Sequence, residues 1–160
     1  MTDETDLKHL GRCVELAAKA VKTGNPPFGS VLVDGNGDVK YEGHNLTADG
    51  DATQHPEFAI ARWAAANMTQ DERAESTVYT SGEHCPMCAA AHGWVGLGRI
   101  VYASSSEQLT MWLAQLGVAP PPVATLPINT VIPGVPVEGP FPVMAEAVRK
   151  LHERFNNSQS

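Results

Sequence analysis

Two short motifs in the 160-residue chain combine the side chains that a catalytic zinc ion requires. His55-Pro56-Glu57 supplies an imidazole and a carboxylate, and Cys85-Pro86-Met87-Cys88 supplies two thiols. One His and two Cys give zinc three protein ligands and leave the fourth tetrahedral position for water, as in catalytic rather than structural sites. Glu57 is then an unliganded carboxylate that can take a proton from the water and return it to a leaving group. The spacing predicts a hydrolytic zinc site.

Each motif has a simpler interpretation when it is taken alone. His-Pro-Glu also begins ordinary helices, where a Glu in the first turn favours the helix dipole. Cys85 and Cys88 could form half of a four-ligand structural zinc site, but Cys13 is the only other cysteine, so a histidine would have to complete it. The same two cysteines also fit a thioredoxin-like redox pair. Both motifs together favour the catalytic interpretation, and Cys13 is expected to be a buried core residue.

The remaining histidines are weaker candidates. His84 and His92 flank the predicted cysteine helix, so we expect them either to reach the substrate pocket or to pack behind the ligands. His9, His44 and His152 have no ligand spacing and are expected to be solvated or locally hydrogen-bonded.

Both motifs fall at the predicted N-termini of buried helices. The segments 58–66 and 86–94 are rich in Ala and apolar on nearly all sides. Two helix ends can then face one point, where the helix dipole lowers the pKa values of the thiols.

Strand and helix patterns alternate around these two segments. Apolar spacing predicts a first helix over 7–21, capped by Thr5 or Asp6. The remaining expected elements are strands over 28–33, 39–43, 76–80 and 99–102 and helices over 107–116 and 143–155. Residues 120–142 contain eight prolines and should wrap the surface. This alternation implies a sheet that is covered on both faces.

Composition predicts a single domain over 1–160, with 1–5 and 156–160 frayed. A net charge of −7 disfavours nucleic acid as a partner and favours a small neutral substrate. Three cysteines cannot form a paired disulfide framework, the acidic N-terminus lacks a signal peptide, and no apolar run reaches the ~20 residues of a membrane span. We therefore expect a cytoplasmic protein without membrane contact.

The chain resembles the cytidine deaminase superfamily over about residues 7–115. Within it the likeness is to the branch of small guanine, cytosine and tRNA adenosine deaminases, and to guanine deaminase-like nucleobase deaminases in particular. The motifs occur in the family's order and include the His-x-Glu and Cys-x-x-Cys signature of zinc deaminases. They are residues 25–33, 43–45, 55–57 and 79–88.

This resemblance implies a fold, a cofactor and further site residues. The fold is a three-layer α/β/α sandwich around a five-stranded mixed sheet, the cofactor is Zn²⁺, and the assembly is a homodimer whose subunits complete each other's pockets. Asn45 falls where the family binds the substrate ring, Phe28 and the imidazole of His55 would sandwich the base, and Trp94 matches an aromatic residue of the pocket wall. Core packing is the alternative for Phe28 and Trp94.

The edge of the expected pocket departs from the branch. Gly82, His84 and His92 replace its usual residues, and 113–118 lacks the carboxylates with which guanine deaminases contact their base. The zinc chemistry carries over, but specificity for guanine does not. We therefore expect a deaminase of a free amino-substituted base, such as guanine, cytosine, a modified base or an aminotriazine. A tRNA adenosine deaminase, which needs a basic surface, and a non-catalytic zinc-binding module are the alternatives.

Overall fold

The computed structural model describes residues 3–159, in which five strands form one mixed sheet. The strands are β1 (Gly29–Val33), β2 (Val39–His44), β3 (Thr77–Gly82), β4 (Arg99–Ser104) and β5 (Val137–Glu138). Their spatial order is β2-β1-β3-β4-β5. β1 pairs antiparallel with β2 and β3, whereas β3, β4 and β5 run parallel. The C-terminal ends of β3 and β4 and the N-terminal end of β1 therefore lie at one edge of the sheet.

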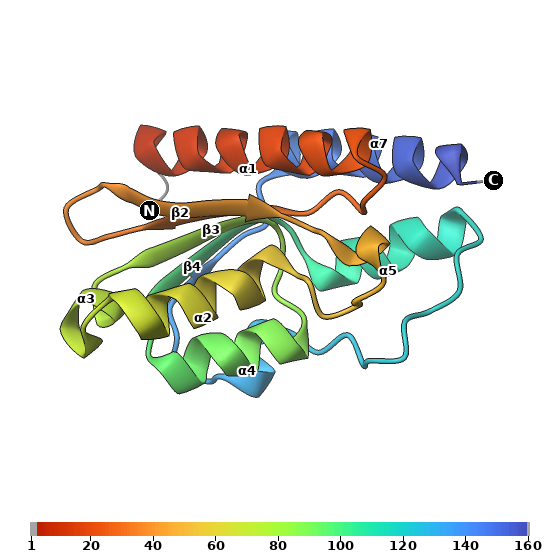
Figure 1. Ribbon diagram of the computed structural model, residues 1–160. Coiled ribbons are helices and arrows are strands. Elements are labelled where there is room, and N and C mark those ends of the chain that lie inside the picture. The colour runs from red at the N-terminus through yellow and green to blue at the C-terminus, as the bar shows by residue number, and fades with distance from the viewer. Residues whose placement is uncertain (1–2, 160) are drawn as a thin grey trace.

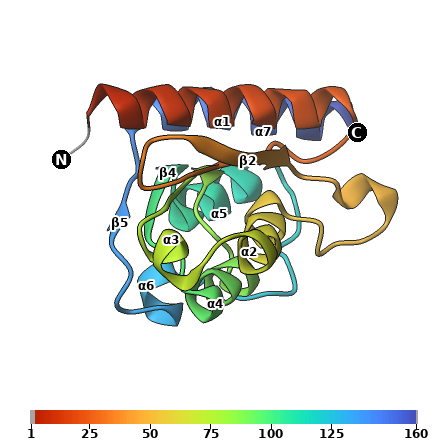
Figure 2. The same cartoon turned by 60° about the vertical axis from the view of Figure 1, so that its left-hand side comes forward.

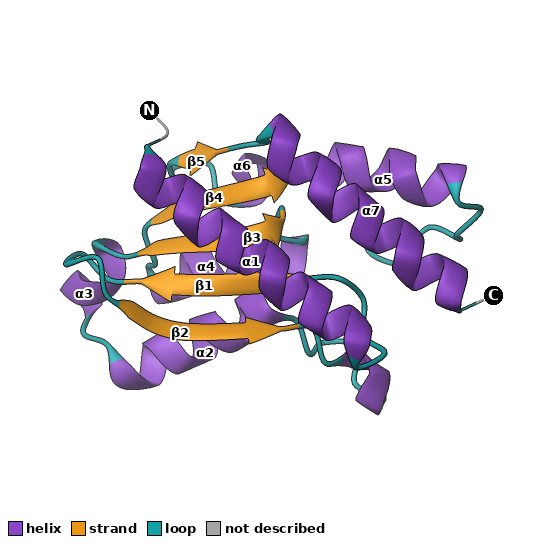
Figure 3. Ribbon diagram, turned by 90° about the horizontal axis from the view of Figure 1, so that it is seen from above, coloured by secondary structure: helices purple, strands orange, loops and turns teal. Residues whose placement is uncertain are grey.

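Helices cover both faces of this sheet (Figure 1). Those described are α1 (Glu4–Lys22), α2 (Pro56–Asn67), α3 (Gln70–Ala74), α4 (Pro86–Val95), α5 (Ser106–Gln115), α6 (Ile128–Val131) and α7 (Pro142–Ser158), with a 3₁₀ turn at Thr47–Asp49. α1 and α7 pack side by side on one face, and α2 and α4 pack together on the other (Figures 1 and 3). The predicted three-layer α/β/α sandwich with a five-stranded mixed sheet is confirmed.

Each face of the sheet has its own apolar core. Leu10 and Leu16 of α1 meet Val31, Val101 and Val148 on one side. On the other side, α2 packs against the alternate side chains of the central strands; this second cluster contains Leu32, Ile60, Ala61, Ala64, Val78 and Leu97. Successive strand side chains point to opposite faces, so Val31 and Leu32 enter different cores.

The helix ends differ from the predictions. α1 begins at Glu4 because Asp3, and neither Thr5 nor Asp6, is its N-cap: the Asp3 side chain accepts a hydrogen bond from the backbone N–H of Asp6 at 2.9 Å. Glu4 and Thr5 are therefore helical rather than frayed. α7 likewise continues to Ser158. Residues 1, 2 and 160 of the segments predicted to fray lie outside the described residues.

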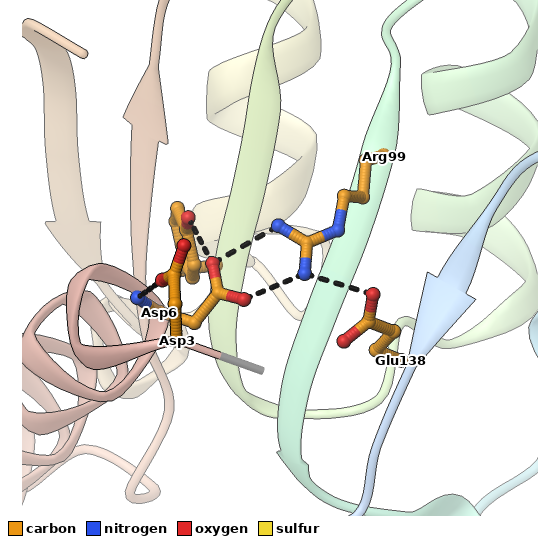
Figure 4. Close-up of polar contacts among 5 residues, drawn as sticks. Asp3, Asp6, Arg99 and Glu138 are labelled. Carbon is orange, nitrogen blue, oxygen red and sulfur yellow. Dashed lines mark hydrogen bonds and ion pairs between the residues drawn. The ribbon is translucent and has the colours of Figure 1, made fainter. Parts of the chain in front are cut away.

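A buried ion pair attaches the first turn of α1 to the sheet (Figure 4). The Asp6 carboxylate accepts hydrogen bonds from the Tyr79 hydroxyl at 2.6 Å and from Arg99 Nη1 and Nη2 at 3.0 and 2.7 Å. Arg99 Nη2 also lies 2.9 Å from Glu138 Oε1. The group therefore joins α1 to β3, β4 and β5. Its hydrogen bonds from Arg99 hold the pKa of Asp6 below its ordinary value.

The Pro-rich segment contains more structure than the sequence predicts. α6 and β5 both lie within 120–142, and β5 extends the sheet by pairing with Ile100 and Val101. α3 is a further helix without a sequence prediction, and it begins with a capping box formed by Thr69 and Glu72. None of the helices in residues 3–159 is long and apolar enough to cross a membrane.

Candidate active site

Two helices begin at the sheet edge with the same unusual sequence pattern. His55 is the N-cap of α2 and Cys85 is the N-cap of α4, and each precedes a proline at the first helical position. Both N-cap residues have extended backbone, as the residue before proline requires. Neither side chain caps its helix. The two side chains that would ordinarily bind helix N–H groups are therefore available to meet each other.

His55, Cys85 and Cys88 form a compact triangle of donor atoms. Cys85 Sγ lies 3.6 Å from His55 Nδ1 and 3.6 Å from Cys88 Sγ, and Cys88 Sγ lies 3.5 Å from His55 Nδ1. Tetrahedral zinc with ordinary bond lengths requires S···N separations of about 3.5 Å and S···S separations of about 3.8 Å. The donor set and its spacing therefore fit zinc, and these residues are positioned to bind it.

The surroundings of Cys85 favour the ionised thiol that a metal requires. The pKa of Cys85 falls to about 4, chiefly because the Cys88 thiol hydrogen-bonds its thiolate, with His55 and the backbone N–H of Cys88 adding to the effect. The pKa of His55 rises for the matching reason, since Cys85 is its hydrogen-bond partner. The pKa of Cys88 is raised, because its thiol donates to Cys85 and is buried, so a metal ion must displace protons from Cys88 and His55 when it binds.

Glu57, in the first turn of α2, is buried beside this triangle. Its Oε1 lies 2.8 Å from the Ser30 hydroxyl and 3.2 Å from the Thr80 hydroxyl, and these two hydroxyls lie 2.9 Å apart. Burial raises the pKa of Glu57. Within residues 3–159 no lysine or arginine pairs with this carboxylate. The side chain is therefore fixed at one oxygen by neutral donors and can exchange a proton.

Ser30 and Thr80 were not among the residues predicted from the sequence. Both stand in strands whose residues are almost all buried, β1 and β3. A hydroxyl inside an otherwise apolar strand needs a partner, and that is the signal that could have identified them.

Phe28 and Asn45 lie next to each other at the same edge of the sheet. The backbone N–H of Asn45 donates to the Phe28 carbonyl at 3.0 Å, and the Asn45 side chain accepts from the Thr47 backbone and hydroxyl at 2.8 Å each. The next residue, Gly29, lets α1 lie close to β1, because a Cβ there would lie 2.4 Å from the carbonyl oxygen of Cys13 on α1. The ring of Phe28 meets the His152 ring of α7 edge to face at 5.3 Å.

His84 and His92 are buried against each other. Both are about 1% exposed, and their rings meet at 5.4 Å in a T-shaped pair. His92 Nε2 bonds the Gly98 carbonyl at 2.7 Å, whereas neither ring nitrogen of His84 has a hydrogen-bond partner within the described residues. Burial lowers the pKa of His92 to about 4, so this imidazole is neutral.

Trp94 is not brought to the other predicted site residues. It lies in the last turn of α4, roughly 13 Å along the helix from Cys85, and is 89% exposed. A cleft of about 330 Å³ borders His55 on the side of α1 and β2, but Glu57, Cys85 and Cys88 do not line it. His55 is therefore the one metal ligand that this cleft reaches.

The other histidines and Cys13 have structural surroundings. His9 stacks on Tyr79, and His152 is 3% exposed between Phe28 and Trp112, so the prediction of solvated or locally bonded rings is wrong for both. His44 does bond locally, to the Asn45 carbonyl at 2.9 Å. Cys13 is buried in the core beneath α1, as predicted.

Residues 3–104 match the family model described as the cytidine and deoxycytidylate deaminase zinc-binding region, which covers well over half of the chain. The chain belongs to this family. The deaminase is thus a zinc-dependent hydrolase of C–N bonds, as the sequence predicts.

Relatives of this deaminase differ in the substrates for which they are named. It is 34% identical over 118 residues to a probable cytosine deaminase of Schizosaccharomyces pombe, covering 74% of this chain and 72% of that protein. It is 37% identical over 103 residues to a tRNA-specific adenosine deaminase of Haemophilus influenzae, covering 64% and 60%. The fold matches the guanine deaminase of Nitrosomonas europaea with a TM-score of 0.70 at 19% identity, covering 98% of this chain and 86% of that one.

Proposed function

We propose that this enzyme deaminates a free amino-substituted nucleobase or a related N-heterocycle, such as a guanine-like, cytosine-like or modified base or an aminotriazine. The observation that carries the proposal is the buried carboxylate of Glu57 beside His55, Cys85 and Cys88. A structural zinc site has no use for an unpaired carboxylate at this position, whereas hydrolysis needs one.

Proton transfer is the role assigned to Glu57. His55, Cys85 and Cys88 would hold the zinc ion, which would supply an activated water by lowering the pKa of that water to near neutrality. Glu57 would take one proton from the attacking water and give it to the ring nitrogen. It would then take the second proton from the new hydroxyl on the ring carbon and give it to the amine, so that the C–N bond breaks, ammonia leaves and the ring carbon keeps the oxygen as a carbonyl. Ser30 and Thr80 hold one oxygen of the carboxylate throughout. Backbone N–H groups in the first turn of α4, after Pro86, are assigned to binding developing negative charge.

Phe28 and Asn45 are assigned to substrate binding. Phe28 would stack on the base opposite His55, and Asn45 would hydrogen-bond the ring edge. The contact between Phe28 and His152 supports a closed pocket, because it puts the C-terminal helix of the same chain against the proposed stacking residue. A pocket covered in this way favours a free base over a nucleotide within a loop of RNA.

The charge of the chain also favours a small substrate over tRNA. It contains 18 Asp and Glu against 11 Lys and Arg, whereas a tRNA enzyme needs a basic surface for phosphates. A tRNA adenosine deaminase is the second candidate, and it is favoured by the identity to the enzyme of Haemophilus influenzae.

Ammonia release from a panel of substrates tests the proposal. The zinc-loaded enzyme is assayed with guanine, cytosine, modified bases, aminotriazines and an adenosine-34 tRNA, and Glu57→Gln provides the matched blank. We expect ammonia from at least one free base and none from the tRNA. Salt-sensitive tRNA deamination without base turnover would establish the second candidate. Full zinc occupancy with no turnover of any substrate would indicate a non-catalytic module.

We further propose a cytoplasmic homodimer. The three unpaired cysteines support a reducing compartment, and the 89% exposed indole of Trp94 supports a subunit contact on α4. Light scattering should give twice the chain mass of 17.1 kDa. Trp94→Asp should shift this value toward one chain, while Val143→Asp, which alters an equally exposed apolar residue on α7, should not.

A further inference from the structure

Glu83 connects the loop that carries Cys85 to three other parts of the chain. Its backbone N–H donates to the Ser104 carbonyl at 2.8 Å, at the end of β4. One carboxylate oxygen accepts the Ser106 N–H at 2.9 Å, and the other accepts the Ile128 N–H at 2.9 Å. Ser106 and Ile128 are the first residues of α5 and α6. A single carboxylate, two residues before a zinc ligand, thus binds the N-termini of two helices.

The bond to Ile128 replaces a cap that α6 does not have. Pro127 precedes Ile128 as the N-cap and makes no side-chain cap. Ile128 is about 1% exposed, so its N–H needs a protein partner if it is to avoid the cost of an unpaired buried donor. Glu83 is that partner.

α6 also packs directly against the cysteine helix (Figure 2). A Cβ on Gly93 would lie 2.4 Å from Ile132 Cγ2, so the glycine lets the chain that follows α6 lie against α4. The start of α6 is thus bound by Glu83, before α4, and its C-cap Ile132 lies against Gly93, within α4.

In the connection from α5 to α6, the backbone N–H groups of residues 116–118 bond back to α5. Residues 119–127 are all exposed, and residues 119–126 make no hydrogen bond to any described residue. This exposed connection returns to the body of the protein at Ile128. Because Glu83 binds both Ser106 and Ile128, it attaches the start of α5 and the start of α6 to the loop that carries Cys85.

We propose that Glu83 is a positioning residue for the zinc site, and that it couples the geometry of Cys85 to the docking of α6. Its two side-chain hydrogen bonds hold the loop 83–85 to α5 and α6, neither of which carries a metal ligand. Loss of the carboxylate frees this loop and undocks α6 together. The inference rests on the metal site and not on the choice of substrate.

Glu83→Ala tests both halves of the proposal. Outer-shell partners of metal ligands commonly change metal affinity by 10- to 100-fold. We expect zinc to pass to a chelating dye at least ~10-fold faster than from the wild type, and the visible spectrum of the cobalt-substituted protein to shift. Hydrogen exchange should accelerate in the peptide spanning 128–135 and stay unchanged in α3. Glu107→Ala is the matched control, because Glu107 is exposed in the first turn of α5 and should change none of these readouts.

Two milder variants separate the effects of the two hydrogen bonds that the Glu83 carboxylate accepts. Ser106→Pro removes only the N–H that α5 donates to Glu83. Proline is tolerated at this first helical position, because the preceding residue, Ser105, already has extended backbone. It should accelerate zinc loss less than Glu83→Ala and leave exchange at 128–135 unchanged. Glu83→Gln keeps one acceptor oxygen and should lie between the wild type and Glu83→Ala in both readouts.

The outcomes decide between coupling and simple packing. Faster exchange at 128–135 with wild-type zinc loss and an unchanged cobalt spectrum would overturn the proposal, since Glu83 would then only dock α6. If Glu83→Ala does not fold, Glu83→Gln and Ser106→Pro decide: wild-type zinc loss in both contradicts the coupling, and faster zinc loss in both supports it.

Discussion

Two buried carboxylates lie on opposite faces of β3 and have opposite electrostatic surroundings. Asp6 reaches the strand from α1 and accepts hydrogen bonds from Tyr79 and from both terminal nitrogens of Arg99. Glu57 reaches it from α2 and meets the Thr80 hydroxyl. Tyr79 and Thr80 are neighbours in sequence, so their side chains point into different layers. A charged pair and a carboxylate able to exchange a proton therefore lie on the two faces of the same strand.

The two carboxylates differ in the charge of their hydrogen-bond partners. Arg99 compensates the charge of Asp6, and the pKa of Asp6 is lowered. Glu57 is buried with neutral hydroxyls, and its pKa is raised. A carboxylate held ionised by a cation contributes to stability, whereas one that is buried without such a pair remains able to gain and lose a proton. Substitutions at the two sites should therefore separate stability from activity.

Glu57→Gln should have the largest effect on activity. The amide keeps the shape and one oxygen acceptor for Ser30 but cannot carry the proton, so ammonia release should fall by about 10³-fold, within the usual range for a general acid–base group. Zinc content and the midpoint of urea unfolding should stay near those of the wild type. Turnover within tenfold of the wild type in the zinc-loaded variant would remove Glu57 from the mechanism.

Asp6→Ala should have the largest effect on stability. It leaves Arg99 without its main partner, and breaking a buried pair is costly. The expected loss is about 2–3 kcal/mol of unfolding free energy, below the range for fully buried pairs because the Arg99 side chain keeps 27% exposure and still contacts Glu138. Turnover per folded, zinc-loaded molecule should not change. Urea unfolding with Asp71→Ala on α3 as the control measures this, and an equal loss in both variants contradicts it.

Ser30→Ala should weaken the support of Glu57 without removing the acid. With one of its two hydroxyl donors gone, the carboxylate is less well placed, and kcat should fall about tenfold. Ser104→Ala is the matched control, because Ser104 is also a buried strand serine whose hydroxyl is bonded at 2.8 Å, to the Ser81 carbonyl. Equal kcat values for the two variants would show that the Ser30 bond does not position Glu57.

The sequence predicts one of these two carboxylate sites far better than the other. His55, Glu57, Cys85 and Cys88 lie within short motifs at two helix starts, where local spacing and the following prolines already imply their geometry. Asp6 and Arg99 are 93 positions apart, and no local pattern joins them. Local sequence instead predicts that residues 1–5 fray and that Asp6 is at most a helix cap. Their pairing depends on how α1 crosses the sheet.

Contacts between distant segments also explain why β5, α6 and the surroundings of His152 were not predicted from the sequence. β5 has only two residues and pairs through a register that tertiary contacts set, so its composition gives almost no strand signal. α6 has four residues, and its start is bound by Glu83, 45 positions earlier. His152 reads as one residue of an amphipathic helix until α7 is placed against Phe28. Contacts between distant segments, rather than local propensity, determine all three.

Acid should remove the stabilising contribution of Asp6, and this is the smallest of the expected effects. Because Arg99 lowers the pKa of Asp6 in the folded protein, the unfolded chain takes up this proton at higher pH than the folded one. The contribution is complete above the unfolded pKa of about 3.9 and is lost as the pH falls through the lower, folded value. The difference in unfolding free energy between the wild type and Asp6→Asn should therefore be constant from about pH 5 to 8 and shrink below about pH 4. Both chains contain Glu57 and the same zinc ligands, so the protonation of those groups cancels in the difference. A difference that stays constant down to about pH 3 while both chains remain folded would mean that the Asp6 contribution does not depend on its charge.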